Sequence, residues 1–165
     1  MTLDELNQLS REAFVARVGF VFEDSPWVAD RAWAERPWPS LEALHQSMVR
    51  VVEAAPREAQ LALIRAHPDL GSRARMAPAS QAEQRGAGLD ALSPAEYERI
   101  QALNQAYRER FGFPFILAVR GKGKQQVFAA LEARLTNPPE AEFQTALREI
   151  YRIAYFRLAD LLHQP

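Results

Sequence analysis

The sequence predicts an all-α fold, a compact single-domain helical bundle, and three features of the chain support this class. Apolar residues recur at helical spacing, as Leu41, Leu44 and Met48 do, which places them on one face of a helix. Helix-start signals precede such stripes. The clearest is Ser93-Pro94-Ala95-Glu96, a capping box with a proline at the first helical position. Finally, the one strand-like apolar run has no partner strand elsewhere in the chain, so a β-sheet is not expected.

Each predicted helix combines a start signal with an apolar stripe of helical period. In chain order, the predicted helices begin near Thr2, Ser10, Pro26, Ser40, Pro56, Ser80, Ser93, Lys124 and Thr136. Glycines are expected to end one of these helices and to weaken another. Gly112 should end the helix that starts at Ser93, and Gly86 and Gly88 should weaken the one that starts at Ser80.

The length and composition limit the number of domains and the classes of function that the protein can have. With 165 residues, 48% of them hydrophobic, the chain can bury a core as a single domain spanning residues 1–165. A formal net charge of −1 argues against a nucleic-acid-binding protein, because such binding depends on neutralising phosphates. The absence of cysteine excludes disulfides, thiolate metal sites and cysteine nucleophiles, and it fits a cytoplasmic location. The acidic stretch from Met1 to Glu5 is unlike a signal peptide, and no apolar stretch approaches membrane-spanning length.

The stretch His67-Pro68-Asp69-Leu70-Gly71 is the first of three segments suited to chemistry. Proline disfavours helical geometry at the residue before it, so the helix that starts at Pro56 is expected to end at His67. The imidazole would then lie at a helix terminus and face a loop, where histidine suits proton transfer. The alternative is a structural role, in which His67 caps the last carbonyl groups of its helix as a cation.

The second segment, Ser80-Gln81-Ala82-Glu83-Gln84, concentrates hydrogen-bonding side chains at a predicted helix N-terminus. Ser80 and Glu83 have the spacing of a capping box, which would give both residues a purely structural role. Gln81 and Gln84 lie three residues apart and share a helix face, where their amides can be presented to a polar ligand. On spacing alone, the structural interpretation, in which Ser80 and Glu83 form a capping box, is favoured.

The third segment is the strand-like apolar run, Phe113 to Val119, followed by Arg120 and Gly121. Without a partner strand, residues 113–121 are expected to form one irregular extended segment whose apolar part is buried between helices. Arg120 can present its planar five-donor guanidinium at the edge of a dry pocket. The alternative is an ordinary surface arginine where the chain leaves the core.

Neither a metal centre nor a nucleophilic serine is predicted. The three histidines, His45, His67 and His163, are widely separated, and none is paired with a second ligand at helical spacing. The chain also lacks the Gly-x-Ser-x-Gly motif of α/β-hydrolases. A metal-dependent function is therefore poorly supported, whereas hydrolysis by a Ser-His-Asp triad is left open, although all-α folds rarely contain one.

Taken together, the three segments resemble those of a known family. The motifs of the 2-oxo-4-hydroxy-4-carboxy-5-ureidoimidazoline (OHCU) decarboxylases are similar to His67 to Gly71, to Ser80 to Gln84 with Ala87-Gly88-Leu89-Asp90, and to Phe111-Gly112-Phe113-Pro114-Phe115 leading to Arg120-Gly121. The similarity extends from Phe14 to Leu158, and the order and clustering of the motifs make it specific. It implies an all-α, commonly homodimeric enzyme without a cofactor, which decarboxylates OHCU to (S)-allantoin in urate degradation.

The resemblance also implies roles for individual residues. It makes His67 the proton donor and Glu83 a second catalytic residue. It assigns substrate binding to Pro68, Ser80, Gln81, Ala82, Gln84, Ile116, Leu117, Ala118, Val119 and Arg120. This sequence departs little from the family pattern at those positions. The compact linker from Ser72 to Ala79 is a departure whose length would alter how the loop closes.

The implied reaction suits these residue types. The electron density left by departing CO2 can pass into the ring C=N bond of the substrate, so the enzyme has to provide a dry, oriented site and a proton on one face. Two other functions stay open. One is a non-catalytic helical interaction module that docks through its tryptophans and last helix, and the other is hydrolysis of a related ureide.

Overall fold

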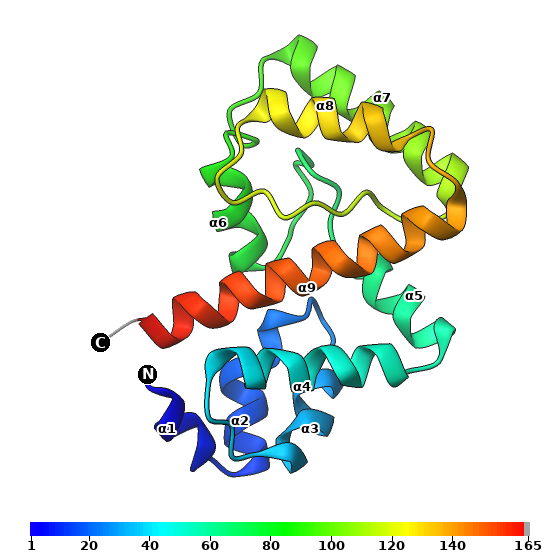
Figure 1. Ribbon diagram of the computed structural model, residues 1–165. Coiled ribbons are helices and arrows are strands. Elements are labelled where there is room, and N and C mark those ends of the chain that lie inside the picture. Colours follow the sequence, from blue (N-terminus) through cyan, green and yellow to red (C-terminus); the bar gives the residue numbers. More distant parts are fainter. Residues whose placement is uncertain (164–165) are drawn as a thin grey trace. The chain divides into compact units, whose positions relative to one another are not determined.

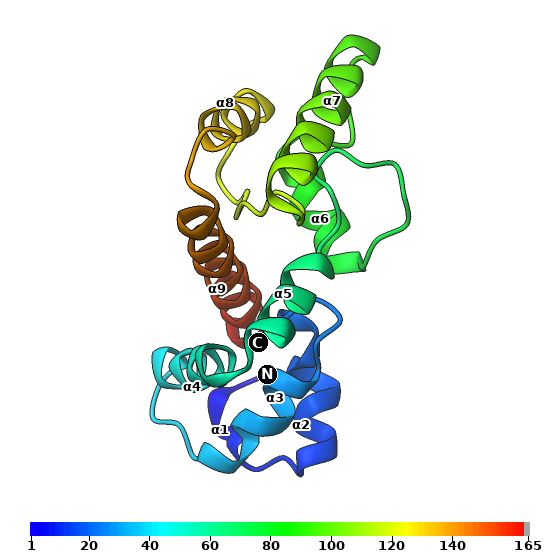
Figure 2. The same ribbon diagram turned by 90° about the vertical axis from the view of Figure 1, so that its right-hand side faces the viewer.

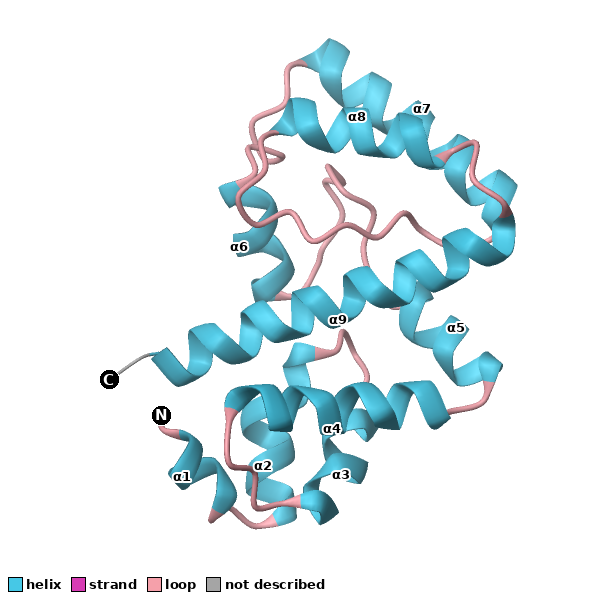
Figure 3. Cartoon of the chain, in the orientation of Figure 1, coloured by secondary structure: helices cyan, strands magenta, loops and turns pink. Residues whose placement is uncertain are grey.

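The computed structural model describes residues 1–163, which form helices joined by loops (Figures 1 and 3). The helices are α1 (Leu3–Asn7), α2 (Arg11–Val18), α3 (Trp27–Ala32), α4 (Leu41–Ala54), α5 (Arg57–Arg65), α6 (Pro78–Gly86), α7 (Pro94–Phe111), α8 (Lys124–Arg134) and α9 (Pro139–His163). Short 3₁₀ helices, Gly19–Val21 and Trp33–Glu35, follow α2 and α3. No strand occurs among residues 1–163, which confirms the predicted all-α class. Within the same range, no helix is long and apolar enough to cross a membrane.

Four of the nine predicted helix starts are confirmed by side-chain caps that the structure shows. Three side chains accept a backbone N–H group in the first turns of α1, α2 and α4, namely those of Thr2, Ser10 and Ser40. Ser93 and Glu96 make both hydrogen bonds of a capping box at the start of α7. Gly112 ends that helix in the left-handed conformation, with φ of 79°, which glycine adopts without the steric cost of a Cβ.

The chain forms two compact units. The first contains residues 1–66 and the α9 residues from Tyr151 onward. Trp38 belongs to its core, because its ring stacks on Phe14 at 5.2 Å and its indole N–H donates to the Ser47 hydroxyl at 2.9 Å. This use of a tryptophan is structural, and it removes Trp38 from any exposed docking face.

The second unit contains residues 67–150, and therefore every residue predicted for the site. Helices α7 and α8 pack against each other at one end of this unit (Figures 1 and 2). Helix α6 lies below α7 in the view of Figure 2. The remaining parts are the loop from His67 to α6, the segment between α7 and α8, and the first part of α9.

The segment between α7 and α8 is irregular and buried, as predicted. Residues 113–119 are all buried and have no helical or strand hydrogen bonding. Two side chains from neighbouring helices anchor its backbone instead. Arg134 donates to the Ile116 carbonyl at 2.6 Å, and Glu149 accepts the Ala118 N–H at 3.0 Å. These charged side chains satisfy backbone groups that a sheet would otherwise pair.

Arg134 belongs to a buried polar network centred on Glu142, a residue with no exposed surface. The Glu142 carboxylate accepts hydrogen bonds from the Tyr107 hydroxyl at 2.6 Å, from Arg134 Nε at 2.5 Å and from Asn137 Nδ2 at 3.1 Å. Burial, and then the hydrogen bond to Glu142, raises the pKa of Tyr107 far above its usual value. The network therefore holds the tyrosine in its neutral, hydrogen-donating form.

We expect Tyr107→Phe to reduce the loss of stability at alkaline pH. A raised pKa in the folded state means that Tyr107 stabilises the fold fully below its unfolded pKa of about 10. This contribution should be lost as pH rises above that value, by up to about 1.4 kcal/mol per pH unit. Urea unfolding of the wild-type protein and of Tyr107→Phe between pH 7 and 11 measures this loss as a change in the free energy of unfolding. Because the other tyrosines are present in both proteins, a constant difference between the two curves would contradict the prediction.

Candidate active site

His67 directly follows the last turn of α5. The helix ends at Arg65 with Ala66 as its C-cap, two residues before the predicted end. The proline at position 68 disfavours helical geometry at His67. The His67 side chain is only 6% exposed. The expected imidazole at a helix terminus is thus present, but it is buried. A buried position excludes bulk water from the imidazole.

The chain turns sharply just after His67 and Pro68. The Ser72 N–H donates to the Asp69 carbonyl at 3.3 Å, and Gly71 occupies the third position of this turn with φ of +74°. Such a φ favours glycine. A Cβ at Gly71 would also lie 3.0 Å from the side chain of Ile100. Both the turn and the close approach of α7 therefore require glycine in this position.

Two amide side chains hold the peptide bond between Leu70 and Gly71. Gln84 of α6 accepts the Gly71 N–H at 2.9 Å, and Asn104 of α7 donates to the Leu70 carbonyl at 2.9 Å. The first contact joins two of the predicted segments, the Ser80–Gln84 run and the stretch from His67 to Gly71, which we call the histidine loop. Asn104 was not predicted. Its signal in the sequence is a polar residue on the apolar stripe of α7, between Ile100 and Tyr107.

The predicted capping role of Ser80 is wrong. Helix α6 begins at Pro78, and its N-cap is Ala77, which has no side-chain cap. Proline is favoured in the first helical turn because its missing N–H is not needed there, so Pro78 starts the helix two residues before Ser80. Ser80 is consequently inside the helix and only 4% exposed. The proposed capping box with Glu83 is therefore absent.

The remaining residues of the run lie on different faces of α6. Gln84 is buried, Glu83 is half-buried, and Gln81 and Ala82 are exposed. Gln81 and Gln84 both line a cavity of about 270 Å³, together with Ser72, Arg73, Met76 and Arg85. Amides and guanidinium groups there can bind carboxylate and ureido groups. This cavity confirms that the two glutamines share one face of the helix.

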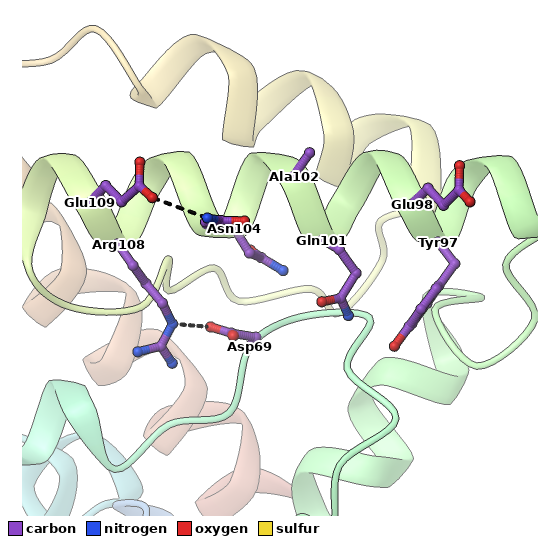
Figure 4. A pocket seen from close by; sticks show the side chains of 9 residues that line it. Asp69, Tyr97, Glu98, Gln101, Ala102, Asn104, Arg108 and Glu109 are labelled. Carbon is purple, nitrogen blue, oxygen red and sulfur yellow. Dashed lines mark hydrogen bonds and ion pairs between the residues drawn. The ribbon is translucent and has the colours of Figure 1, made fainter.

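A second, more open cavity of about 490 Å³ lies along α7 (Figure 4). Figure 4 shows Asp69, from the loop after His67, with its carboxylate toward Arg108 of α7. The two side chains form an ion pair at 2.9 Å. Asn104 also lines this cavity. The contact adds a third attachment of the histidine loop to the helices of the second unit, besides those made by Gln84 of α6 and Asn104 of α7.

The third predicted segment ends in a tight turn. Residues Ile116 to Val119 are buried, whereas Arg120 is exposed. The Lys122 N–H donates to the Val119 carbonyl at 2.9 Å, and Gly121 has φ of +78° at the third turn position. The segment is attached to α8 and α9 through Arg134 and Glu149, as described above. Its convergence with His67 around one substrate stays a prediction.

No cluster of three or more histidine and carboxylate side chains suitable for a metal ion occurs among residues 1–163. The charged side chains of residues 67–150 are arginines, lysines and carboxylates, several of which form ion pairs, such as Arg108 with Asp69 and Lys124 with Glu96. Hydrogen bonding and charge are therefore the means by which the described residues can bind a small polar molecule.

Comparison with known proteins identifies the family. The model of the OHCU decarboxylase family matches residues 7–159. The chain is 49% identical to the 2-oxo-4-hydroxy-4-carboxy-5-ureidoimidazoline decarboxylase of Halalkalicoccus jeotgali, over 98% of this chain and 92% of that protein. It is 52% identical to the uric acid degradation bifunctional protein PucL of Bacillus subtilis, over 98% of this chain and 33% of that longer protein.

A solved structure agrees with the sequence relatives. The crystal structure of an (S)-allantoin synthase superposes with a TM-score of 0.79 at 32% identity, over 98% of this chain and 54% of that one. Residues 7–159, which the family model matches, include all three segments of the candidate site. The chain belongs to the OHCU decarboxylase family.

Proposed function

We propose that this protein catalyses the decarboxylation of OHCU to (S)-allantoin, a step of urate degradation, with His67 as the proton donor. The observation that carries the proposal is the family match over residues 7–159. It is supported by the buried imidazole of His67 and by the hydrogen bond that joins its loop to the Ser80–Gln84 run. The activity makes the protein a carboxy-lyase.

The reaction can proceed with protein groups alone. The bond between the ring carbon and the carboxylate breaks, CO2 leaves, and the electron pair enters the adjacent ring C=N bond. A proton must then be added to one face of the ring to give a single enantiomer of allantoin. A buried imidazole can deliver it without competition from bulk water. His67 is the histidine of the second unit, which makes it the group for this step.

The other predicted residues would bind and orient the substrate. Glu83 is half-buried on α6, where its carboxylate can accept N–H or O–H groups of the ureido or hydroxyl moiety or set the protonation of His67. Arg120 would pair with a carbonyl or carboxylate of the substrate. The remaining contacts are assigned to Pro68, Ser80, Gln81, Ala82, Gln84, Ile116, Leu117, Ala118 and Val119.

We further infer that residues 1–165 act as one OHCU decarboxylase-like domain, because the family model runs without interruption through both compact units. A homodimer in the cytoplasm is proposed from the family resemblance and from the absence of cysteine. Sedimentation equilibrium tests the dimer, and a monomer at micromolar concentration would contradict it. No cofactor is proposed, since the substrate accepts the electron pair itself.

The direct test of the function uses freshly generated OHCU. The spontaneous reaction gives racemic allantoin, so the enzyme should produce optically active allantoin together with one CO2 for each substrate consumed. Hydrolysis of the substrate instead would consume water and release no CO2. A non-catalytic interaction module would leave the product racemic at the spontaneous rate.

We expect (S)-allantoin to protect the protein against thermal unfolding. A ligand at a hundredfold excess over its Kd stabilises the folded state by about 2.7 kcal/mol, which corresponds to a rise in Tm of about 5–10 °C for a chain of this size. Differential scanning fluorimetry measures the shift, and (R)-allantoin is the matched control. Equal shifts with both enantiomers would argue against a stereospecific pocket.

A further inference from the structure

We propose that Asn104 is a positioning residue for the proposed proton donor, His67, and that it acts through the peptide bond between Leu70 and Gly71. The inference rests on the proposed function in one respect, namely that His67 takes part in the reaction. Asn104 lies on α7, outside the three segments to which the family resemblance assigns roles. Its contribution follows from the contacts of the histidine loop.

The two polar groups of a peptide bond point in opposite directions from one rigid plane. In this loop both are held by side chains from different helices. Asn104 Nδ2 donates to the Leu70 carbonyl, and Gln84 Oε1 accepts the Gly71 N–H, each at 2.9 Å. We call this arrangement the amide clamp. Because it fixes the plane from both sides, the peptide cannot rotate without breaking at least one buried hydrogen bond.

The chemistry of Asn104 indicates that its amide is needed for this contact. The residue is only 4% exposed, and its Oδ1 atom is buried without a hydrogen-bond partner. A buried, unsatisfied oxygen is unfavourable, so a leucine of similar size would be the better residue if position 104 only filled space. The asparagine is explained by its Nδ2 group, which supplies the donor that the Leu70 carbonyl requires.

Little of the chain between the amide clamp and His67 can absorb a displacement. Pro68 and Asp69 alone separate His67 from the clamped peptide, and the ring of Pro68 fixes its φ angle. Asp69 is held by the ion pair with Arg108 at 2.9 Å and by the turn hydrogen bond to Ser72 at 3.3 Å. A rotation of the clamped peptide would therefore move the imidazole. A displacement of about 1 Å at a reacting group can cost about 100-fold in rate.

The test replaces Asn104 with leucine, which keeps the volume and removes the donor. We expect kcat for (S)-allantoin formation to fall by about 100-fold. KM should change little, because the other substrate-binding segments stay in place. In NMR spectra, the imidazole C–H signals of His67, assigned by their loss in His67→Asn, should shift. Gln105→Leu is the matched control, because this neighbouring residue is exposed and donates only to Glu109 at 3.1 Å. It should change neither readout.

Three outcomes would overturn the inference. A folded Asn104→Leu protein with wild-type kcat would do so, and so would lost activity with unmoved His67 signals, or equal effects of Gln105→Leu. Should Asn104→Leu fail to fold, Asn104→Ser replaces it, since a serine hydroxyl lies one bond closer to the helix and does not reach Leu70. If the wild-type protein itself shows no stereospecific turnover, the proposed function fails. The NMR comparison then still decides whether Asn104 positions the histidine.

Discussion

Replacing His67 with asparagine should abolish the formation of optically active allantoin in a protein that remains folded. Asparagine keeps much of the polarity of the buried site but cannot deliver a proton near neutral pH. Removal of a general acid costs about 100-fold to 10,000-fold in rate. Polarimetry on freshly generated OHCU measures the effect, because residual spontaneous decay gives racemic product and adds no rotation.

His45→Asn is the matched control for this experiment. His45 lies on α4 in the first unit, where its Nε2 atom is 2.7 Å from the Tyr151 carbonyl. Burial lowers its pKa, so His45 favours the neutral form and has a structural contact of its own. This variant should retain stereospecific turnover. Undiminished turnover by His67→Asn would remove His67 from the mechanism, whatever the control shows.

Replacing Arg134 with methionine should cause a large loss of stability. The guanidinium is paired with Glu142, and the two side chains are 12% and 0% exposed. Removal of one partner leaves a buried carboxylate without its counter-charge, which typically costs about 3–5 kcal/mol. The Ile116 carbonyl loses its donor in the same substitution. Urea titration measures the loss of unfolding free energy that results from both effects together.

Arg85→Met provides the comparison for Arg134→Met. Arg85 is 3.9 Å from Asp90, and both side chains are more than half exposed, at 68% and 54%. An exposed ion pair contributes less than about 1 kcal/mol, so this variant should unfold almost as the wild type does. Comparable losses of unfolding free energy in Arg134→Met and Arg85→Met would show that burial does not increase the contribution of the Glu142 network to stability.

Local signals in the sequence predict the helices well, because they act within a few residues. The capping box of Ser93 and Glu96 and the stop at Gly112 are both confirmed. Ser80 shows the limit of this reasoning. A serine followed three residues later by glutamate suggests a cap, but Pro78 starts the helix earlier and leaves Ser80 buried within it. Competing start signals can thus shift the start of a helix by three residues, here from a cap at Ser80 to one at Ala77, and change the environment of a site residue.

The residues that sequence reasoning missed act across long distances in the chain. Asn104, Arg134 and Glu149 each bind a backbone group that lies more than a dozen residues away. No periodicity or motif marks a backbone group as the partner of a particular side chain. The sequence could therefore predict that residues 113–119 are buried and irregular, but not what holds them in place.

The way in which this segment is anchored has a consequence for protein engineering. In a sheet, residues other than proline can occupy a paired position whatever their side chain, since the neighbouring backbone supplies the hydrogen bonds. Here the backbone of Ile116 and Ala118 depends on side chains at two distant positions, Arg134 and Glu149. Residues 113–121 grafted onto another helical scaffold would therefore keep their conformation only if both anchoring side chains were transplanted with them.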